Sequence, residues 1–79
     1  MNKIPCYIKK NSAKLRKILD SKGYKYGGHD DFTLCRARNM WLYCANGIYS
    51  EIYPDIDEET ESNSINCGKS EDLFLDIIS

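Results

Sequence analysis

The residues of this chain that could bind a metal or attack a substrate are four cysteines and one histidine: Cys6, His29, Cys35, Cys44 and Cys67. Intervals of 28, 8 and 22 residues separate successive cysteines, so no two stand close together in the chain. Structural zinc sites usually take two closely spaced pairs of ligands. The spacing therefore predicts no metal site and no cofactor, and it favours small thiols buried in strands.

His29 stands before Asp30 and Asp31, the one sequence in the chain with acid–base character. A histidine beside carboxylates can transfer protons when a substrate lies near it. Gly27-Gly28 precedes this triplet, and paired glycines followed by aspartates are typical of a turn. No serine or cysteine nucleophile motif lies nearby. We therefore predict a solvated turn, no catalytic residues and no enzymatic activity.

Charge is distributed unevenly along the chain. Ten basic residues lie between Lys3 and Arg38 against three acids, whereas the remainder of the chain holds one lysine and nine acids. Such an asymmetry is associated with nucleic-acid, membrane or self-complementary contacts. A nucleic-acid interface would use the basic first half, with Tyr24, Tyr26 or Trp41 stacking on bases. Its basic residues would be Lys10, Lys14, Arg16, Lys17, Lys22, Lys25, Arg36 and Arg38. A pI of 5.7 weighs against this hypothesis, because dedicated nucleic-acid-binding domains usually exceed about 9.

Half of these eight basic residues belong to a predicted helix at residues 12–22. Leu15 and Leu19 recur at the spacing of an apolar helix face, and lysine and arginine cover the remaining surface. Gly23 follows where a left-handed residue commonly ends a helix, and Tyr24 can fold back on Leu19. The helix is therefore amphipathic, with a basic outer face.

Asn46-Gly47 is the clearest turn signal, and it predicts a hairpin of Met40–Ala45 with Ile48–Tyr53. A two-residue turn fixes the register of both strands. The predicted pairs are Ala45 with Ile48, Tyr43 with Ser50 and Trp41 with Ile52. Both faces of this hairpin carry apolar side chains, whereas a sheet with one wet face alternates apolar and polar residues. We therefore expect the second face to be covered by the chain itself, another subunit or a ligand.

Weaker signals place the remaining strands. Lys3–Ile8 reads as an edge strand, because its proline lacks an amide donor. Tyr24–Tyr26 is predicted as a short strand before a turn at residues 27–31, and Phe32–Cys35 as the return strand. Ser64–Cys67 is a candidate last strand.

The C-terminal third combines an acidic stretch with an apolar helix. Residues 54–63 contain little apolar material and are predicted to form a mobile acidic loop. Ser70 can cap a helix at residues 70–78, whose apolar side chains cover roughly 200° of its circumference. That arc is wider than one sheet face covers, so part of it either meets another molecule or is wedged within the fold.

These elements predict one α+β domain spanning residues 1–79, with a small antiparallel sheet of three to five strands and two helices. The expected order is β-α-β-β-β-(β)-α. No apolar run approaches the roughly 20 residues that span a bilayer, and the N-terminus does not look like a signal peptide. We therefore expect a cytoplasmic protein with free thiols and no membrane contact.

The segments that carry a resemblance are Leu15–Leu19 with Lys22–Tyr24, Leu42–Tyr49, and Ile65–Gly68 with Leu73–Leu75. In these segments the chain resembles a group of small uncharacterised proteins of gut anaerobic bacteria and their mobile elements. The resemblance spans most of the chain, and the matching residues are structural. It implies this fold and a bacterial or phage origin, and it implies no activity.

Two hypotheses for the function follow. The first is a protein-interaction module, whose partner is another protein or a second copy of the chain. Its candidate contact residues lie in the hairpin and the last helix: Trp41, Leu42, Tyr43, Tyr49, Tyr53, Leu75 and Ile78. The alternative is a nucleic-acid-binding accessory protein that uses the basic face of the first helix.

Overall fold

Nine segments of regular structure follow one another in the computed structural model, which describes residues 4–30 and 32–79. The strands are β1 (Cys6–Lys9), β2 (Lys25–His29), β3 (Trp41–Ala45), β4 (Ile48–Ile52) and β5 (Ile65–Asn66). The helices are α1 (Ala13–Ser21), α2 (Phe32–Ala37), α3 (Glu58–Ser62) and α4 (Glu71–Ile78). The strands form one sheet in the order β2-β4-β3-β1-β5, so the α+β prediction is confirmed.

The sheet is mixed. β3 pairs antiparallel with β1 and with β4, whereas β1 pairs parallel with β5 and β2 pairs parallel with β4. The prediction of an antiparallel sheet is therefore wrong for the two outer pairs. Within the described residues, β3 runs against the other strands. The carboxyl ends of β1, β2, β4 and β5 thus meet the amino end of β3 at a single edge.

The central hairpin is confirmed with its predicted register. Ala45 pairs with Ile48, Tyr43 with Ser50 and Trp41 with Ile52. Asn46 and Gly47 have φ angles of 54° and 77°, the left-handed conformation that a type I′ turn requires at both positions.

The first helix also agrees with its prediction. The Ser12 hydroxyl accepts a hydrogen bond from the Leu15 amide at 3.2 Å and caps the helix. At the other end the Tyr24 amide donates to the Leu19 carbonyl and the Gly23 amide to the Asp20 carbonyl, both at 3.1 Å. These two bonds define a Schellman ending, which Gly23 permits with its φ of 90°.

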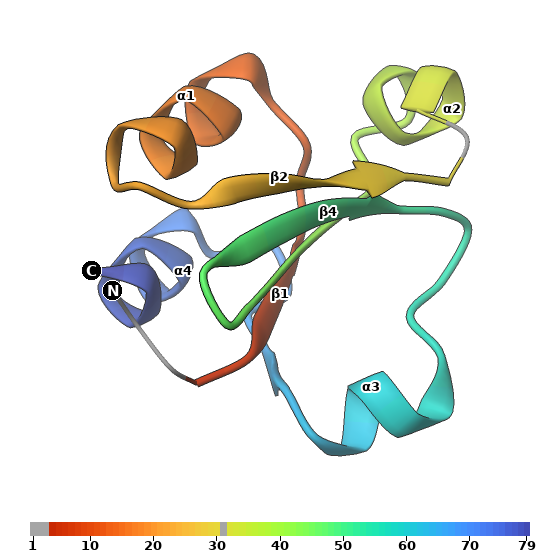
Figure 1. Ribbon diagram of the computed structural model, residues 1–79. Coiled ribbons are helices and arrows are strands. Elements are labelled where there is room, and N and C mark those ends of the chain that lie inside the picture. The colour runs from red at the N-terminus through yellow and green to blue at the C-terminus, as the bar shows by residue number, and fades with distance from the viewer. Residues whose placement is uncertain (1–3, 31) are drawn as a thin grey trace.

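One face of the sheet carries the hydrophobic core. Figure 1 shows α1 (orange) and α4 (blue) on that side of the sheet and α3 (cyan) on the other. The cluster comprises Cys6, Ile8, Leu15, Leu19, Tyr24, Leu42, Cys44, Tyr49, Cys67, Phe74 and Ile78. Ser70 caps α4 by accepting from the Leu73 amide, as predicted. The wide apolar arc of α4 is therefore largely wedged within the fold, while Leu73 stays 42% exposed.

The segment before the hairpin differs from its prediction. β2 continues through Gly27 and Gly28 to His29 where a turn was expected, because His29 pairs with Glu51 of β4 after a register shift at the two glycines. Phe32–Ala37 forms helix α2 instead of a return strand, so tertiary contacts override the β-propensity of that segment. Asp31, the last residue of the expected turn, lies outside the described residues.

The acidic stretch also contains a helix that the sequence did not predict. Asp57 caps α3, since its carboxylate accepts the Thr60 amide at 2.7 Å. Glu58, Glu59 and Glu61 lie in the first turn, where the helix dipole favours negative charge. The structure thus has four helices in its described residues, against two predicted. None of them has the length and apolar character that a membrane span needs.

Candidate functional site

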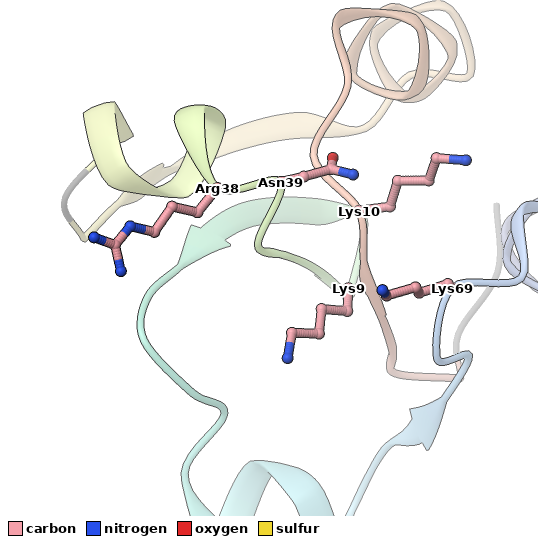
Figure 2. A pocket seen from close by; sticks show the side chains of 5 residues that line it. All are labelled: Lys9, Lys10, Arg38, Asn39 and Lys69. Atoms are coloured by element: carbon pink, nitrogen blue, oxygen red, sulfur yellow. The ribbon is translucent and has the colours of Figure 1, made fainter.

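A pocket lined mainly by basic side chains lies where the strand ends meet. Lys9 is the last residue of β1, and Lys10 follows it. Arg38 and Asn39 precede β3, and Lys69 follows β5. These residues enclose about 280 Å³ and are called the basic pocket below. Figure 2 shows Lys10 and Arg38 pointing to opposite sides of the opening, with Lys9 and Lys69 between them. Segments distant in sequence converge here because the parallel pairings bring the ends of β1 and β5 together.

Little negative charge balances the basic pocket. Lys10 donates to the Glu71 carboxylate, and the Lys14 ammonium lies 3.6 Å from it. This hydrogen bond with Lys10, together with the two positive charges, lowers the pKa of Glu71. Within residues 4–30 and 32–79, no ion pair involves Lys9 or any of the pocket's remaining cations.

Two of the other basic side chains, those of Lys9 and Arg38, lie against aromatic rings. The Lys9 ammonium lies 5.5 Å from the centre of the Trp41 ring, which Tyr7 contacts edge-on at 5.3 Å. The Arg38 guanidinium lies 6.0 Å from the Tyr53 ring and donates to its hydroxyl at 3.3 Å. Aromatic faces attract cations without neutralising them. The positive charge of the pocket therefore remains available to an anion.

Asn39 joins the basic pocket to the rest of the fold. Its φ of 55° lies in the left-handed region, which asparagine tolerates better than most residues. Its side-chain oxygen accepts the Asn11 amide at 2.6 Å. This bond ties the segment between α2 and β3 to the segment between β1 and α1, and so fixes the two walls of the pocket.

Asn11 also belongs to a network around a buried carboxylate, that of Glu51 in β4, whose side chain is fully buried. Arg36 donates to both carboxylate oxygens at 2.9 and 2.8 Å, Asn11 donates at 2.9 Å and Tyr26 at 2.8 Å. Burial alone would raise the pKa of Glu51, but these hydrogen bonds and the charge of Arg36 outweigh it and lower the pKa to about 2. The carboxylate is therefore charged and paired.

A second pocket lies between α1 and the Glu51 network, and it encloses about 470 Å³. We call it the helix pocket; it is lined by Ala13, Arg16, Lys17, Asp20, Tyr26, Arg36 and Tyr49. Three cations face one carboxylate there. Asp20 accepts the Tyr49 hydroxyl at 2.6 Å, and burial followed by this bond raises the pKa of Tyr49.

A third pocket is acidic and lies on the face of the sheet that α3 partly covers. It encloses about 360 Å³. We call it the acidic pocket; it is lined by Asp30, Tyr43, Ser50, Ile52, Asp55, Ile56, Asp57 and Thr60. Positive and negative pockets thus occupy different parts of the molecule, although β4 and its flanking residues adjoin both kinds.

The structure divides the residues predicted for protein interaction. Leu42, Tyr49 and Ile78 are buried in the core beneath α1 and α4, so the chain itself covers that face of the hairpin. Leu75 packs partly against the same core. The half-buried residues of the hairpin and its exit are Trp41, Tyr43 and Tyr53.

The predicted basic residues are divided as well. Lys10 and Arg38 line the basic pocket, whereas Arg16, Lys17 and Arg36 line the helix pocket. Lys14 contacts Glu71, and Lys22 and Lys25 lie beyond the carboxyl end of α1. The sequence did not identify Lys9, Asn39 and Lys69, because their convergence depends on parallel pairing that no local pattern encodes.

The cysteines and the histidine form no site in the described part of the chain. All four cysteines are buried, as predicted, and no cluster of three or more possible metal-ligating side chains exists among residues 4–30 and 32–79. A hydrogen bond with Cys6 and burial raise the pKa of Cys44, and burial raises that of Cys67 to about 11. The His29 ring contacts the Asp30 backbone carbonyl at 2.8 Å, and the Asp30 carboxylate instead accepts the Tyr53 amide.

The chain matches no family model, no curated protein and no solved structure. Its function must therefore be argued from its own side chains. The geometry contains fixed cations, half-exposed aromatic rings and acidic side chains in separate pockets. This arrangement is suited to binding charged partners.

Proposed function

We propose that this chain is a small non-enzymatic binding module whose basic pocket contacts the phosphate groups of a nucleic acid. The observation that carries the proposal is the convergence of four cations, from three separate segments, at one edge of the sheet. Gathering like charges raises the free energy of the folded state unless an anion offsets it. A phosphate backbone supplies such anions at regular intervals.

The position of the acidic residues supports this proposal. Asp55 and Asp57, which precede α3, line the separate acidic pocket, and Figure 1 shows α3 itself on the opposite side of the sheet from α1. The lining of the basic pocket itself contains four cations and no acid, so a phosphate group that enters it meets positive charge although the whole chain has a net charge of −1. Local potential, more than net charge, steers a charged ligand to a site.

Burial of the hairpin's inner face adds indirect support. The hypothesis of an interaction surface on that face depended on apolar side chains that needed a cover, and α1 and α4 supply that cover. The cations of the basic pocket have no comparable internal counterpart, since Glu71 pairs with Lys10 and Lys14 only. The basic pocket therefore keeps unmatched charge at the surface, whereas the inner apolar face of the hairpin is covered.

Fluorescence anisotropy with labelled oligonucleotides tests the proposal, first at low ionic strength and then at rising salt. The double variant Arg38→Gln/Lys69→Gln should bind more weakly and should reduce the slope of log K against log salt by about 1.5, since each phosphate contact contributes about 0.7–0.9. Lys22→Gln/Lys25→Gln is the matched control, because it removes the same charge outside the basic pocket and the helix pocket. Absence of binding at low salt, or an equal loss in both double variants, would overturn the proposal.

Binding of a basic protein segment is a second candidate, and the acidic pocket favours it. Asp30, Asp55 and Asp57 surround Tyr43 and Ile52, so the pocket combines a negative rim with an apolar floor. A lysine or arginine side chain carries an apolar stem and a charged end, which match that combination. The partner in this candidate is another protein with an exposed basic segment.

Charge removal at Asp55 tests this second candidate. Affinity for a lysine-rich and arginine-rich peptide should fall in Asp55→Asn and stay unchanged in Asp72→Asn, which lies on α4 outside the acidic pocket. Light scattering distinguishes a second copy of the chain from a foreign partner. Concentration-dependent dimers that disappear in Asp55→Asn would identify self-association and would count against a foreign partner.

A further inference from the structure

We infer that the helix pocket receives an unpaired base stacked on Tyr26, so that the nucleic acid bound by this chain is single-stranded. This inference rests on the proposed function and specifies its ligand. Tyr26 is 46% exposed, yet its hydroxyl donates to the fully buried Glu51 carboxylate at 2.8 Å. Burial first and then this bond raise the pKa of Tyr26 to about 12, so the phenol keeps its proton and its bond at neutral pH. The ring is thus held in one position while a large part of it faces solvent.

The Glu51 network holds the ring before any ligand arrives. Arg36 occupies both carboxylate oxygens and Asn11 one of them, so the position of the Tyr26 hydroxyl is set by groups that belong to β4, α2 and the segment before α1. Ordering a side chain on binding costs free energy, and a ring already ordered avoids that cost. Tyr26 therefore has the rigidity expected of a stacking platform.

Neighbouring rings extend the platform. The Tyr49 ring lies 5.4 Å from the Tyr26 ring at an angle of 57°, on the side toward the core. The His29 ring lies 6.4 Å away and is tilted by only 31°. Both contacts are with rings of the sheet, and the helix pocket opens beside Tyr26 toward α1.

The cations of the helix pocket are placed to receive the backbone of a stacked nucleotide. Arg16 lines the pocket. One nitrogen of its guanidinium donates hydrogen bonds to the backbone oxygen and the side-chain oxygen of Asn11, and these bonds fix the orientation of the Arg16 side chain. Lys17 is exposed, and no ion pair involves it within the described residues. Asp20 supplies the acceptor that an exocyclic amino group or a ribose hydroxyl requires.

The combination of a ring with cations selects single strands over duplexes. A duplex stacks both faces of its bases on their neighbours, whereas an unpaired base can lie on an aromatic ring. A purely electrostatic surface would not need the half-exposed, anchored ring that this pocket contains. The segment of Lys10, Asn11 and Ala13 links the two pockets, so one strand can pass from the helix pocket to the basic pocket.

The test compares three ligands of similar charge: a single-stranded homopolymer, a hairpin duplex and inorganic polyphosphate. Affinity for the single strand should fall roughly 5- to 100-fold in Tyr26→Leu, since stacking on one ring contributes that much per base. Polyphosphate affinity should stay unchanged. Tyr26→Phe keeps the ring but loses its anchoring hydrogen bond to Glu51, so its affinity for the single strand should lie between those of the native chain and Tyr26→Leu, with thermal melts showing whether each variant folds.

Tyr26→Trp provides a second readout if the leucine variant fails to fold. It should bind the single strand at least as tightly as Tyr26→Phe does, because indole also stacks on bases, and a stacked base should quench the fluorescence of the added tryptophan, which the native chain, with Trp41 alone, does not contain. Equal affinity of the native chain for all three ligands, unaffected by Tyr26→Leu or Tyr26→Trp, would overturn the base subsite and leave the phosphate proposal intact. Failure of the native chain to bind any of the three would end both.

Discussion

Arg36 and Arg38 stand two positions apart in the chain and have opposite surroundings. The Arg36 guanidinium makes two hydrogen bonds to the buried carboxylate of Glu51. The Arg38 guanidinium lies over Tyr53, and in the part of the chain that the structure describes no carboxylate pairs with it. One arginine completes the fold, and the other leaves its charge at the surface. The comparison shows that two basic residues close together in sequence can differ in whether a carboxylate offsets their charge, a difference that the distribution of charge along the sequence does not reveal.

Replacement of Arg36 should give the largest difference between the two regions. Arg36→Met leaves the Glu51 carboxylate buried without its charged partner, and breaking such a pair costs about 3 kcal/mol or more of unfolding free energy. Arg38→Met is the matched control and should change stability by less than about 0.5 kcal/mol. Urea denaturation followed by circular dichroism measures both. Equal losses would show that the two arginines are not distinguished by their counter-charges.

Lowering the pH should reduce the free energy of unfolding through the same Glu51 network. The folded-state pKa of Glu51 is about 2 and its ordinary value is 4.5, so the unfolded chain binds this proton more readily. The stabilisation is complete above pH 4.5 and is lost as the pH falls toward 2, a change of about 2–3 kcal/mol. Glu51→Gln should remove that slope from the stability profile between these pH values. A variant that keeps the slope would assign it to other carboxylates.

Asn39 connects the two regions, and its variants should have intermediate effects. Asn39→Ala loses the acceptor for the Asn11 amide and places an alanine at a φ of 55°, which together should cost about 2 kcal/mol. Asn39→Gly removes the acceptor but tolerates the φ angle, so it should cost about 1 kcal/mol. Thermal unfolding of the two variants separates the contributions. A larger loss in the glycine variant would contradict this account.

The smallest predicted effect has the opposite sign. Lys69→Gln should raise the free energy of unfolding by about 0.3 kcal/mol at low salt, because it relieves repulsion in the basic pocket. The gain should disappear at high ionic strength, where such interactions are screened. Lys22→Gln serves as the control, because Lys22 lies outside the basic pocket and the helix pocket. A destabilised Lys69→Gln would mean that an internal group already balances this charge.

Local signals predicted the parts of the fold that local interactions determine. Gly23 and Asn46-Gly47 readily adopt the left-handed conformation that a helix end and a tight hairpin turn require. They therefore predicted the end of α1 and the register of the hairpin. Helix α2 could not be predicted this way, because the contact between Arg36 and Glu51 that accompanies it joins segments 15 residues apart. The strand at Ser64–Cys67 was predicted, but its parallel pairing with β1 was not, because the partner and direction of a strand depend on contacts distant in sequence.

The candidate site was predictable to the extent that it lies on α1. Arg16 and Lys17 belong to the basic helix face, and Lys10 and Arg38 were included on charge alone. The sequence does contain a signal for the buried carboxylate, because Glu51 is a charged residue on the hairpin face that it shares with Leu42 and Cys44. A charge on an apolar face requires a partner, and that requirement could have indicated a buried ion pair.

The strand directions separate ligand preference from folding. Lys10, Arg38, Asn39 and Lys69 lie in connecting segments at the edge where the strands end, whereas the core residues lie within the helices and strands. Substitutions at Lys10, Arg38 and Lys69 can therefore accumulate without repacking the interior. A randomised library at these three positions, built on the unchanged core, should yield folded proteins with new ligand preferences. Under the proposed function, the fold is a scaffold whose ligand preference a few substitutions outside the core would alter.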